Sequence, residues 1–189
     1  MTATEIYLQS IDKQRILVIG AGSNLITGII EHTLKFHHRK FDHISSAKPI
    51  SIQSDSPIII INNGPQPIDY KHHIIVFGYT ASSDELSEFE ALANATSKGG
   101  TIIYPNAHSA LNKIGSKERP DVQSIAYEVC KHEVVEGRTV LISSTKERFP
   151  VQLYGDSDLQ CLSAAKELLK KIGISSGNFY KAICEYKTS

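Results

Sequence analysis

The sequence predicts an α/β domain of the three-layer, P-loop type, with a mostly parallel sheet, helices on both faces and a small antiparallel extension. Short β-branched runs alternate with helical segments along most of the chain. Two of these runs, residues 58–61 and 74–77, are apolar without alternation, which is typical of strands buried on both faces of a parallel sheet. In addition, an apolar strand leads through Gly20 and Gly22 directly into an apolar helix.

Each expected strand is a short run of β-branched or other apolar residues bounded by turn-forming ones. The runs lie at residues 16–19, 50–52, 58–61, 74–77, 101–104, 139–142 and 151–154. After about Pro120 the long helical segments stop, and short strands follow one another through residues 134–154. We therefore expect hairpins there, at one edge of the sheet.

Helical segments lie between and after these strands. Residues 25–36 are apolar almost all round at first, and the basic run at 37–40 suits a helix C-terminus. Ser82 and Glu85 form a capping box for a second helix, which Gly99 ends. The other expected helices lie at residues 159–172 and 178–186.

The composition describes one globular domain, and we predict a single domain over residues 1–189 in which residues 1–13 form a lead-in to the first strand. Twenty basic residues balance 20 acidic ones, so the chain lacks the positive excess that a nucleic-acid partner requires. We expect no membrane partner, because there is no signal-peptide pattern and no apolar run of roughly 20 residues. Three cysteines without a C-x-x-C spacing indicate reduced thiols and a cytoplasmic location.

The glycine turn after the first strand is the candidate binding site. Backbone N–H groups in such a turn hold phosphate together with the positive end of the following helix. A working P-loop adds a lysine for the phosphates and a hydroxyl for Mg²⁺, but Asn24 and Leu25 stand at these positions. The candidate cofactor-binding residues are Gly20, Ala21, Gly22, Ser23, Asn24 and Leu25. ATP is the expected ligand, bound weakly at most, and the sequence indicates no catalytic residue and no metal ligand.

The order of these segments resembles the central, ATP-binding domain of the Mur ligases, the amino-acid-adding family of peptidoglycan synthesis and recycling. In that family the first strand leads to G-T-x-G-K-T-T-T, and residues 18–27 occupy this place. The family's next buried strand ends in an acidic residue that serves Mg²⁺, whereas the strand at 58–61 ends in Asn62 and Asn63. Residues 151–165 are similar to the late family pattern G-x-H-N-x-x-N-x-x-A-A.

The resemblance extends over residues 14–187, but the polar positions depart from it. Ser157 replaces the histidine of the late pattern, and Asp158 and Cys161 replace its asparagines, while the structural glycine and alanines fit. The family's ligases also carry an N-terminal domain for the UDP-sugar and a C-terminal domain for the amino acid, and we expect neither within residues 1–189. The resemblance therefore implies a degenerate relative of the central domain.

Three functions are open at this point. The first is a non-catalytic binding or interaction module linked to peptidoglycan metabolism, whose partner would be a protein of peptidoglycan synthesis or recycling. The second is an ATP-dependent ligase of the UDP-N-acetylmuramate amino-acid or peptide type, with its missing residues supplied by other chains. The third is a dinucleotide-binding protein, because Asp42 lies about 20 positions after the glycine turn. No residue pattern predicts an oligomeric state.

Several polar residues have simpler interpretations than a functional one. The histidine pairs 37–38 and 72–73 do not suit a metal, because adjacent side chains diverge on a strand and on a helix, and we expect them to face solvent. Cys161 is interpreted as a small apolar residue on a helix rather than a reactive thiolate. Asp156 and Asp158 are expected to cap the helix that follows them.

Overall fold

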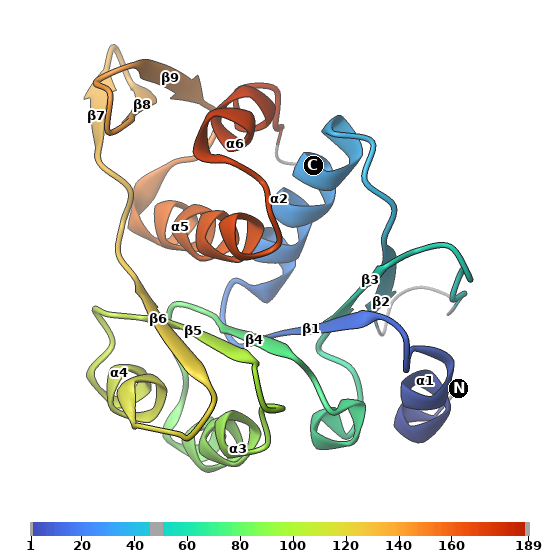
Figure 1. Ribbon diagram of the computed structural model, residues 1–189. Helices are drawn as coiled ribbons and strands as arrows, with labels where there is room; N and C mark the ends of the chain where they lie inside the picture. The colour runs from blue at the N-terminus through green and yellow to red at the C-terminus, as the bar shows by residue number, and fades with distance from the viewer. Residues whose placement is uncertain (1, 46–50, 188–189) are drawn as a thin grey trace.

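A six-stranded parallel sheet forms the middle layer of the molecule (Figure 1). The computed structural model describes residues 2–45 and 51–187. Every pairing in this sheet is parallel, and the strand order is β2-β3-β1-β4-β5-β6. The strands are β1 (Gln14–Ile19), β2 (Asp42–Ser45), β3 (Ile58–Asn62), β4 (Ile74–Phe77), β5 (Thr101–Pro105) and β6 (Gln123–Tyr127). The predicted α/β class is confirmed.

Helices cover both faces of this sheet (Figure 1). One face carries α2 (Ser23–Phe36), α5 (Gly155–Lys171) and α6 (Ser176–Ile183), and the other carries α1 (Ala3–Gln9), the 3₁₀ helix η1 (Pro67–Tyr70), α3 (Ser83–Asn94) and α4 (Ser109–Ser116). The connection through α2 runs toward the β2 edge, whereas those through α3 and α4 run toward the β6 edge. Right-handed crossovers that run in opposite directions lie on opposite faces of a sheet, so the strand order dictates these two layers. Among the described residues, no helix has the length and apolar character of a membrane span.

Two apolar cores form because the central strands are apolar on both sides. Alternate residues of a strand point to opposite faces, so Ile16 and Val18 of β1 join one core, and Leu17 and Ile19 join the other. All four of these side chains are buried. This double burial explains the apolar runs without alternation on which the fold prediction depends.

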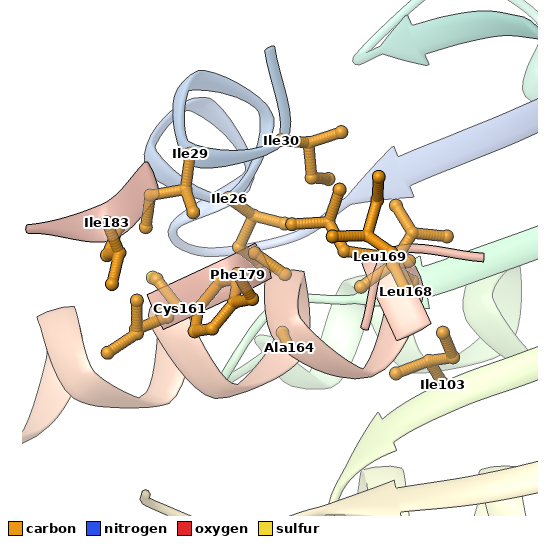
Figure 2. Close-up of a cluster of buried hydrophobic side chains, with 14 of the residues drawn as sticks. Ile26, Ile29, Ile30, Ile103, Cys161, Ala164, Leu168, Leu169, Phe179 and Ile183 are labelled. Atoms are coloured by element: carbon orange, nitrogen blue, oxygen red, sulfur yellow. The ribbon is translucent and has the colours of Figure 1, made fainter. Parts of the chain in front are cut away.

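The core on the α2 side brings the first long helix against the two C-terminal ones, as Figure 2 shows. Ile26 and Ile29 of α2 lie over α5 and α6 in this view. Ala164 is fully buried on α5, where a small side chain lets the helices approach closely. Cys161 is 1% exposed in the same core, as expected for a small apolar residue.

A small antiparallel sheet follows β6, so the predicted hairpins are confirmed, but they form a sheet of their own and do not extend an edge of the parallel sheet. The strands of the small sheet are β7 (His132–Val135), β8 (Arg138–Ile142) and β9 (Arg148–Val151), in the order β7-β8-β9. Glu136 and Gly137 join β7 to β8 with φ angles of +50° and +75°, the conformation that suits a two-residue hairpin turn. The Phe149 ring of β9 stacks on Tyr180 of α6 with centroids 4.5 Å apart, which fastens the small sheet to the domain.

The second strand lies outside the range that the sequence analysis predicts. The structure places it at Asp42–Ser45 rather than at residues 50–52. Residue 50 is outside the described residues, and residues 51 and 52 are not in a strand. The prediction is wrong because β2 is an edge strand whose burial alternates and in which three of four side chains, Asp42, His43 and Ser45, are polar.

Asp42 at the start of β2 is buried because it pairs with Lys13, just before β1. The Lys13 Nζ atom lies 3.6 Å from the Asp42 carboxylate and donates hydrogen bonds to the carbonyl groups of Gln53 and Ser56. The two charged side chains are each 2% exposed. Removal of one partner of such a pair costs about 3–5 kcal/mol, so we interpret Lys13 as an anchor for residues 51–57.

Other element boundaries also differ from the prediction. The lead-in at residues 1–13 contains α1, and the sequence analysis does not anticipate α4 or β6. Gly155 begins α5, four residues before the expected start, and α6 ends at Ile183. The last strand covers Arg148–Val151 instead of residues 151–154.

The expectation that both histidines at 72–73 face solvent is wrong. His72 is fully buried, and its Nε2 atom lies 3.1 Å from the Thr96 hydroxyl. Burial lowers the pKa of His72 to about 4, because the charged imidazole would lose its hydration. His73 is half-buried and accepts a hydrogen bond at Nδ1 from the Arg15 backbone N–H at 3.1 Å, and burial with the neighbouring guanidinium lowers its pKa as well.

These histidines predict a loss of stability in mild acid. Their pKa values are lower in the folded state, so the unfolded chain binds protons first, and stability falls as pH drops from about 6.5 toward about 4. The loss from His72 alone is about 3 kcal/mol over this range. In urea unfolding experiments at several pH values, His72→Gln should flatten most of this dependence while preserving a donor to Thr96.

The exposed His38 provides the control for this experiment. His38→Asn should leave the pH profile of unfolding unchanged, because the His38 side chain is exposed. The variant should also fold normally, because asparagine tolerates the positive φ of +53° at this position. An equal flattening by both substitutions would contradict the assignment to buried histidines.

Candidate functional site

The glycine loop lies at the carboxyl edge of the sheet, where β1 passes between β3 and β4. From here the chain enters α2 on one face, whereas β4 leads to α3 on the other face (Figure 1). Ligands of open α/β sheets bind in the crevice at such a switch point. Gly20 and Gly22 have φ angles of +89° and +83°, which turn the chain from the strand into the helix.

Gly22 is the N-cap of α2 and has no room for a side chain. A Cβ atom there would lie 2.4 Å from Sγ of Cys161 and 2.9 Å from Cε1 of Tyr79. The Cys161 thiol also donates a long hydrogen bond of 3.7 Å to the Gly22 carbonyl. Burial, reinforced by Asp158, raises the pKa of Cys161 to about 12, so the thiol keeps its proton at neutral pH.

Some backbone N–H groups of the loop already have acceptors within the protein. The Ser23 N–H donates to the Gly20 carbonyl at 3.1 Å, and the Ala21 N–H donates to the Thr80 carbonyl at 3.4 Å. The N–H groups of Asn24 and Leu25 lie in the first turn of α2 and have no partner among the described residues. An anion would therefore meet the remaining N–H groups and the positive helix end, but not a full ring of backbone donors, because the N–H groups of Ala21 and Ser23 are already used.

Two side-chain hydrogen bonds connect the end of β3 to the start of α2. Asn62 donates from Nδ2 to Oδ1 of Asn24 at 2.7 Å, and Asn63 donates from Nδ2 to Oγ of Ser23 at 2.8 Å. In a P-loop site this region holds Mg²⁺ through a hydroxyl and an acidic side chain. Within residues 2–45 and 51–187, no three His, Cys, Asp or Glu side chains are placed to hold a metal ion. Neutral amides paired with one another do not fit a nucleotide-bound Mg²⁺.

A cavity of about 470 Å³ opens above the loop, and we call it the loop cavity. Its lining residues come from the loop, the ends of β3 and β4 and the first turns of α5; they are Gly20, Gly22, Ser23, Asn24, Leu25, Asn63, Tyr79, Ser157, Asp158 and Cys161. This described lining includes no lysine, arginine or histidine. Asp158 is its one charged member, so the cavity carries a negative charge.

A second, smaller cavity of about 220 Å³ adjoins the loop cavity and shares Gly20 and Asn63 with it. Glu85 and Glu88 of α3 line this neighbour. The Glu85 carboxylate accepts hydrogen bonds from the backbone N–H and hydroxyl of Ser82, which lowers the pKa of Glu85. Both cavities at the carboxyl edge of the sheet are therefore acidic.

The free energies of attraction and repulsion at the loop cavity argue against strong phosphate binding. A helix N-terminus stabilises an anion by about 0.3–1 kcal/mol at exposed sites. Two like charges 4 Å apart repel each other by about 1 kcal/mol in water and about 4 kcal/mol near a protein surface. Asp158 is half-buried and accepts a hydrogen bond from the Tyr154 N–H at 3.0 Å, which holds the carboxylate in place. The expectation that Asp156 and Asp158 are the caps of this helix is wrong, because both lie within α5 and its N-cap is Tyr154. The repulsion from the Asp158 carboxylate offsets the attraction of the helix.

The structure brings the predicted site residues together in one loop. Five of the six line the loop cavity, whereas Ala21 does not and instead accepts a hydrogen bond from the Tyr79 N–H at 3.2 Å. The predicted set omits Asn63, Tyr79 and Asp158, which reach the cavity from other elements. Asn63 and Asp158 occupy positions at which the sequence departs from a known polar pattern, and this is the signal that could identify them.

Comparisons with known proteins reveal the fold. No protein-family model and no curated protein matches the sequence. Among solved structures, the UDP-N-acetylmuramoylalanyl-D-glutamyl-2,6-diaminopimelate–D-alanyl-D-alanyl ligase from Acinetobacter baumannii superimposes with a TM-score of 0.79 at 9% identity, over 99% of this chain and 49% of that one. The MurF ligase from Thermotoga maritima, solved in complex with ADP, gives 0.74 at 10% identity, over 99% and 52%.

Folylpolyglutamate synthetase from Lactobacillus casei is also similar, with a TM-score of 0.68 at 10% identity over 97% of this chain and 66% of that one. The chain thus spans about half the length of the two peptidoglycan ligases. Identities this low show a common fold and nothing more. The predicted resemblance to the central domain of the Mur ligases is confirmed at that level.

The crowding at Gly22 predicts that adding a single methyl group there lowers the stability of the fold substantially. Gly22→Ala combines a positive φ, which costs about 1–2 kcal/mol, with overpacking against Cys161 and Tyr79, which costs about 1–3 kcal/mol more. Urea unfolding should therefore show a loss of about 2–5 kcal/mol.

Gly173 provides a matched control, because its φ is +90° and nothing lies within 4 Å of a Cβ atom there. Gly173→Ala should therefore lose only the stability that the positive φ costs, about 1–2 kcal/mol. If the two alanine variants lost the same stability, the close contact of Cys161 and Tyr79 with Gly22 would be contradicted.

Proposed function

We propose that this chain is a non-catalytic binding or interaction module with the fold of the Mur ligase central domain, linked to peptidoglycan metabolism. Nucleotide or phosphate binding at residues Gly20, Ala21, Gly22, Ser23, Asn24 and Leu25 is weak at most. The partner is a protein of peptidoglycan synthesis or recycling, and the chain acts in the cytoplasm. The two peptidoglycan ligases among its structural neighbours support the link to this pathway.

One observation carries the proposal: the loop cavity holds a carboxylate and lacks a cation among its described lining residues. Loss of a charge-assisted contact to phosphate costs about 1.5–3 kcal/mol, or a tenfold to hundredfold loss in affinity. The repulsion from Asp158 adds to this loss. The neutral amides of Asn24 and Asn62 lie where a P-loop site holds Mg²⁺, so among the described residues nothing at the loop supplies the group that neutralises charge during phosphoryl transfer.

The alternative is an ATP-dependent ligase of the UDP-N-acetylmuramate amino-acid or peptide type, completed by other chains. A neighbour of the same fold is solved with ADP, which supports nucleotide binding by the fold as such. This hypothesis requires a second chain to bring a cation to the loop cavity and acidic ligands for Mg²⁺. Folylpolyglutamate synthetase shares the fold, so the substrate class does not follow from the fold alone.

The dinucleotide hypothesis receives no support from the position of Asp42. A dinucleotide fold places its ribose-binding acidic residue at the carboxyl end of a strand that neighbours β1. Asp42 stands instead at the amino end of β2, with β3 between β2 and β1, and it is buried against Lys13.

Calorimetric titration with ATP, with and without Mg²⁺, tests the proposed function. We expect a dissociation constant in the millimolar range or weaker, no effect of Mg²⁺ on affinity, and no ATP hydrolysis. Binding that tightens with Mg²⁺, or turnover that requires it, would contradict the proposal and favour the ligase hypothesis.

We expect that removing the negative charge of Asp158 from the loop cavity raises its affinity for anions. Asp158→Asn removes the charge from the loop cavity while its amide oxygen can still accept the Tyr154 N–H, so pyrophosphate should bind about 2- to 10-fold more tightly. Asp156→Asn is the matched control, because Asp156 is exposed on the same turn and does not line the cavity. An equal gain in both variants would show an effect of net charge alone.

A further inference from the structure

A third cavity lies at the junction of the small sheet, α5 and α6, away from the glycine loop. Its volume is about 400 Å³, and we call it the small-sheet cavity. The lining residues come from β8, β9, the segment before α5 and the end of α6; they are Arg138, Pro150, Val151, Gln152, Tyr154 and Cys184. The loop cavity and the small-sheet cavity share no lining residue.

The charge of the small-sheet cavity is opposite to that of the loop cavity. Arg138 is its one charged lining residue among those described, and no carboxylate of the described chain lies within 4.0 Å of the Arg138 guanidinium. By contrast, Arg148 on the neighbouring strand is paired with Glu133. Burial and the neighbouring Glu185 raise the pKa of the Cys184 thiol, so this lining group is neutral at physiological pH.

Apolar and amide groups form the rest of the wall. Pro150 is exposed on β9, whereas the Val151 side chain is only 4% exposed and lies in the core on the α2 side; the Tyr154 side chain is 56% exposed. An exposed aromatic ring of this kind supplies contact area at a low cost in conformational entropy. Gln152 is exposed and can both donate and accept hydrogen bonds.

The frame around the small-sheet cavity is rigid. The tight turn at Glu136 and Gly137 places Arg138 at the start of β8, and Arg138 pairs across the strands with Val135. On the other side, the stack of Phe149 on Tyr180 fixes β9 against α6. A site held by two elements in this way needs little rearrangement to receive a ligand.

We propose that the small-sheet cavity binds a small monocarboxylate that carries an apolar or aromatic group. A guanidinium pairs with a carboxylate through two parallel hydrogen bonds, and a single cation matches a single negative charge. The wall of Pro150 and Tyr154 covers the apolar part, and Gln152 pairs with an amide in the ligand. The volume of the cavity falls in the usual range for small-molecule sites.

Two probes of nearly equal shape test the charge requirement, N-acetyl-L-phenylalanine and its neutral amide, N-acetyl-L-phenylalaninamide. In an NMR titration of the whole chain, the acid should produce saturable shifts in the backbone amides of Val151, Gln152, Tyr154 and Cys184. The neutral amide should bind at least about tenfold more weakly, because it loses the charge-assisted pair. Equal binding of the two probes, or no saturable shift with the acid up to millimolar concentrations, would overturn the proposal.

Substitutions at the guanidinium give the second arm of the test. Arg138→Gln should weaken binding of the acid at least about tenfold, and Arg138→Lys should retain part of the affinity as a point charge. Arg39 is also exposed but lines a different cavity, so Arg39→Gln is the matched control and should bind as the unaltered chain does. The spectrum of each variant reports its folding. Equal loss in Arg39→Gln and Arg138→Gln, or unchanged affinity in a folded Arg138→Gln, would overturn the proposal.

Discussion

The close approach of the backbone at the end of β1 is the constraint on which the carboxyl edge of the sheet depends. A Cβ atom on Gly78 would lie 2.0 Å from the Ala21 carbonyl oxygen, and the Gly78 N–H donates to the Ile19 carbonyl at 2.7 Å. The turn after β4 therefore presses directly on the glycine loop, and this contact brings Tyr79 beside Gly22. Cys161 closes the opposite side from α5. Contacts from the protein itself thus hold the loop in place.

The cavities of this protein differ in charge. The loop cavity and its smaller neighbour carry carboxylates, whereas the small-sheet cavity carries the guanidinium of Arg138, which pairs with no carboxylate of residues 2–45 and 51–187. Cavities of opposite charge on one domain select different ligands, because a charged group that matches one of them is repelled by the other. The fold provides the position of each cavity, but its side chains decide which class of ligand can enter.

The sequence predicts the layers of this fold better than it predicts the edges. Strands such as Ile58–Asn62 are buried on both faces, so their apolar runs are unambiguous. β2 and β6 lie at the sheet edges and have polar, half-exposed sequences, so periodicity alone cannot separate them from loops. The glycine loop is local in sequence and could be predicted, whereas the small-sheet cavity joins Arg138 to Cys184, 46 positions along the chain, and depends on tertiary packing. The burial of His72 likewise depends on its contact with Thr96, which no local pattern reveals.

The neutral pair between Asn24 and Asn62 shows how the side chains at these two positions depend on each other. Position 62 is 4% exposed at the end of β3, so a carboxylate there would have to be compensated by a cation. In a P-loop site the lysine and the Mg²⁺ provide that compensation. With asparagine at position 24, an acidic side chain at 62 would be a buried, uncompensated charge, whereas an asparagine can donate to Asn24 at 2.7 Å without any charge. The two asparagines therefore form one physical unit, and neither a lysine at position 24 nor a carboxylate at position 62 alone would supply both charged groups of a P-loop site.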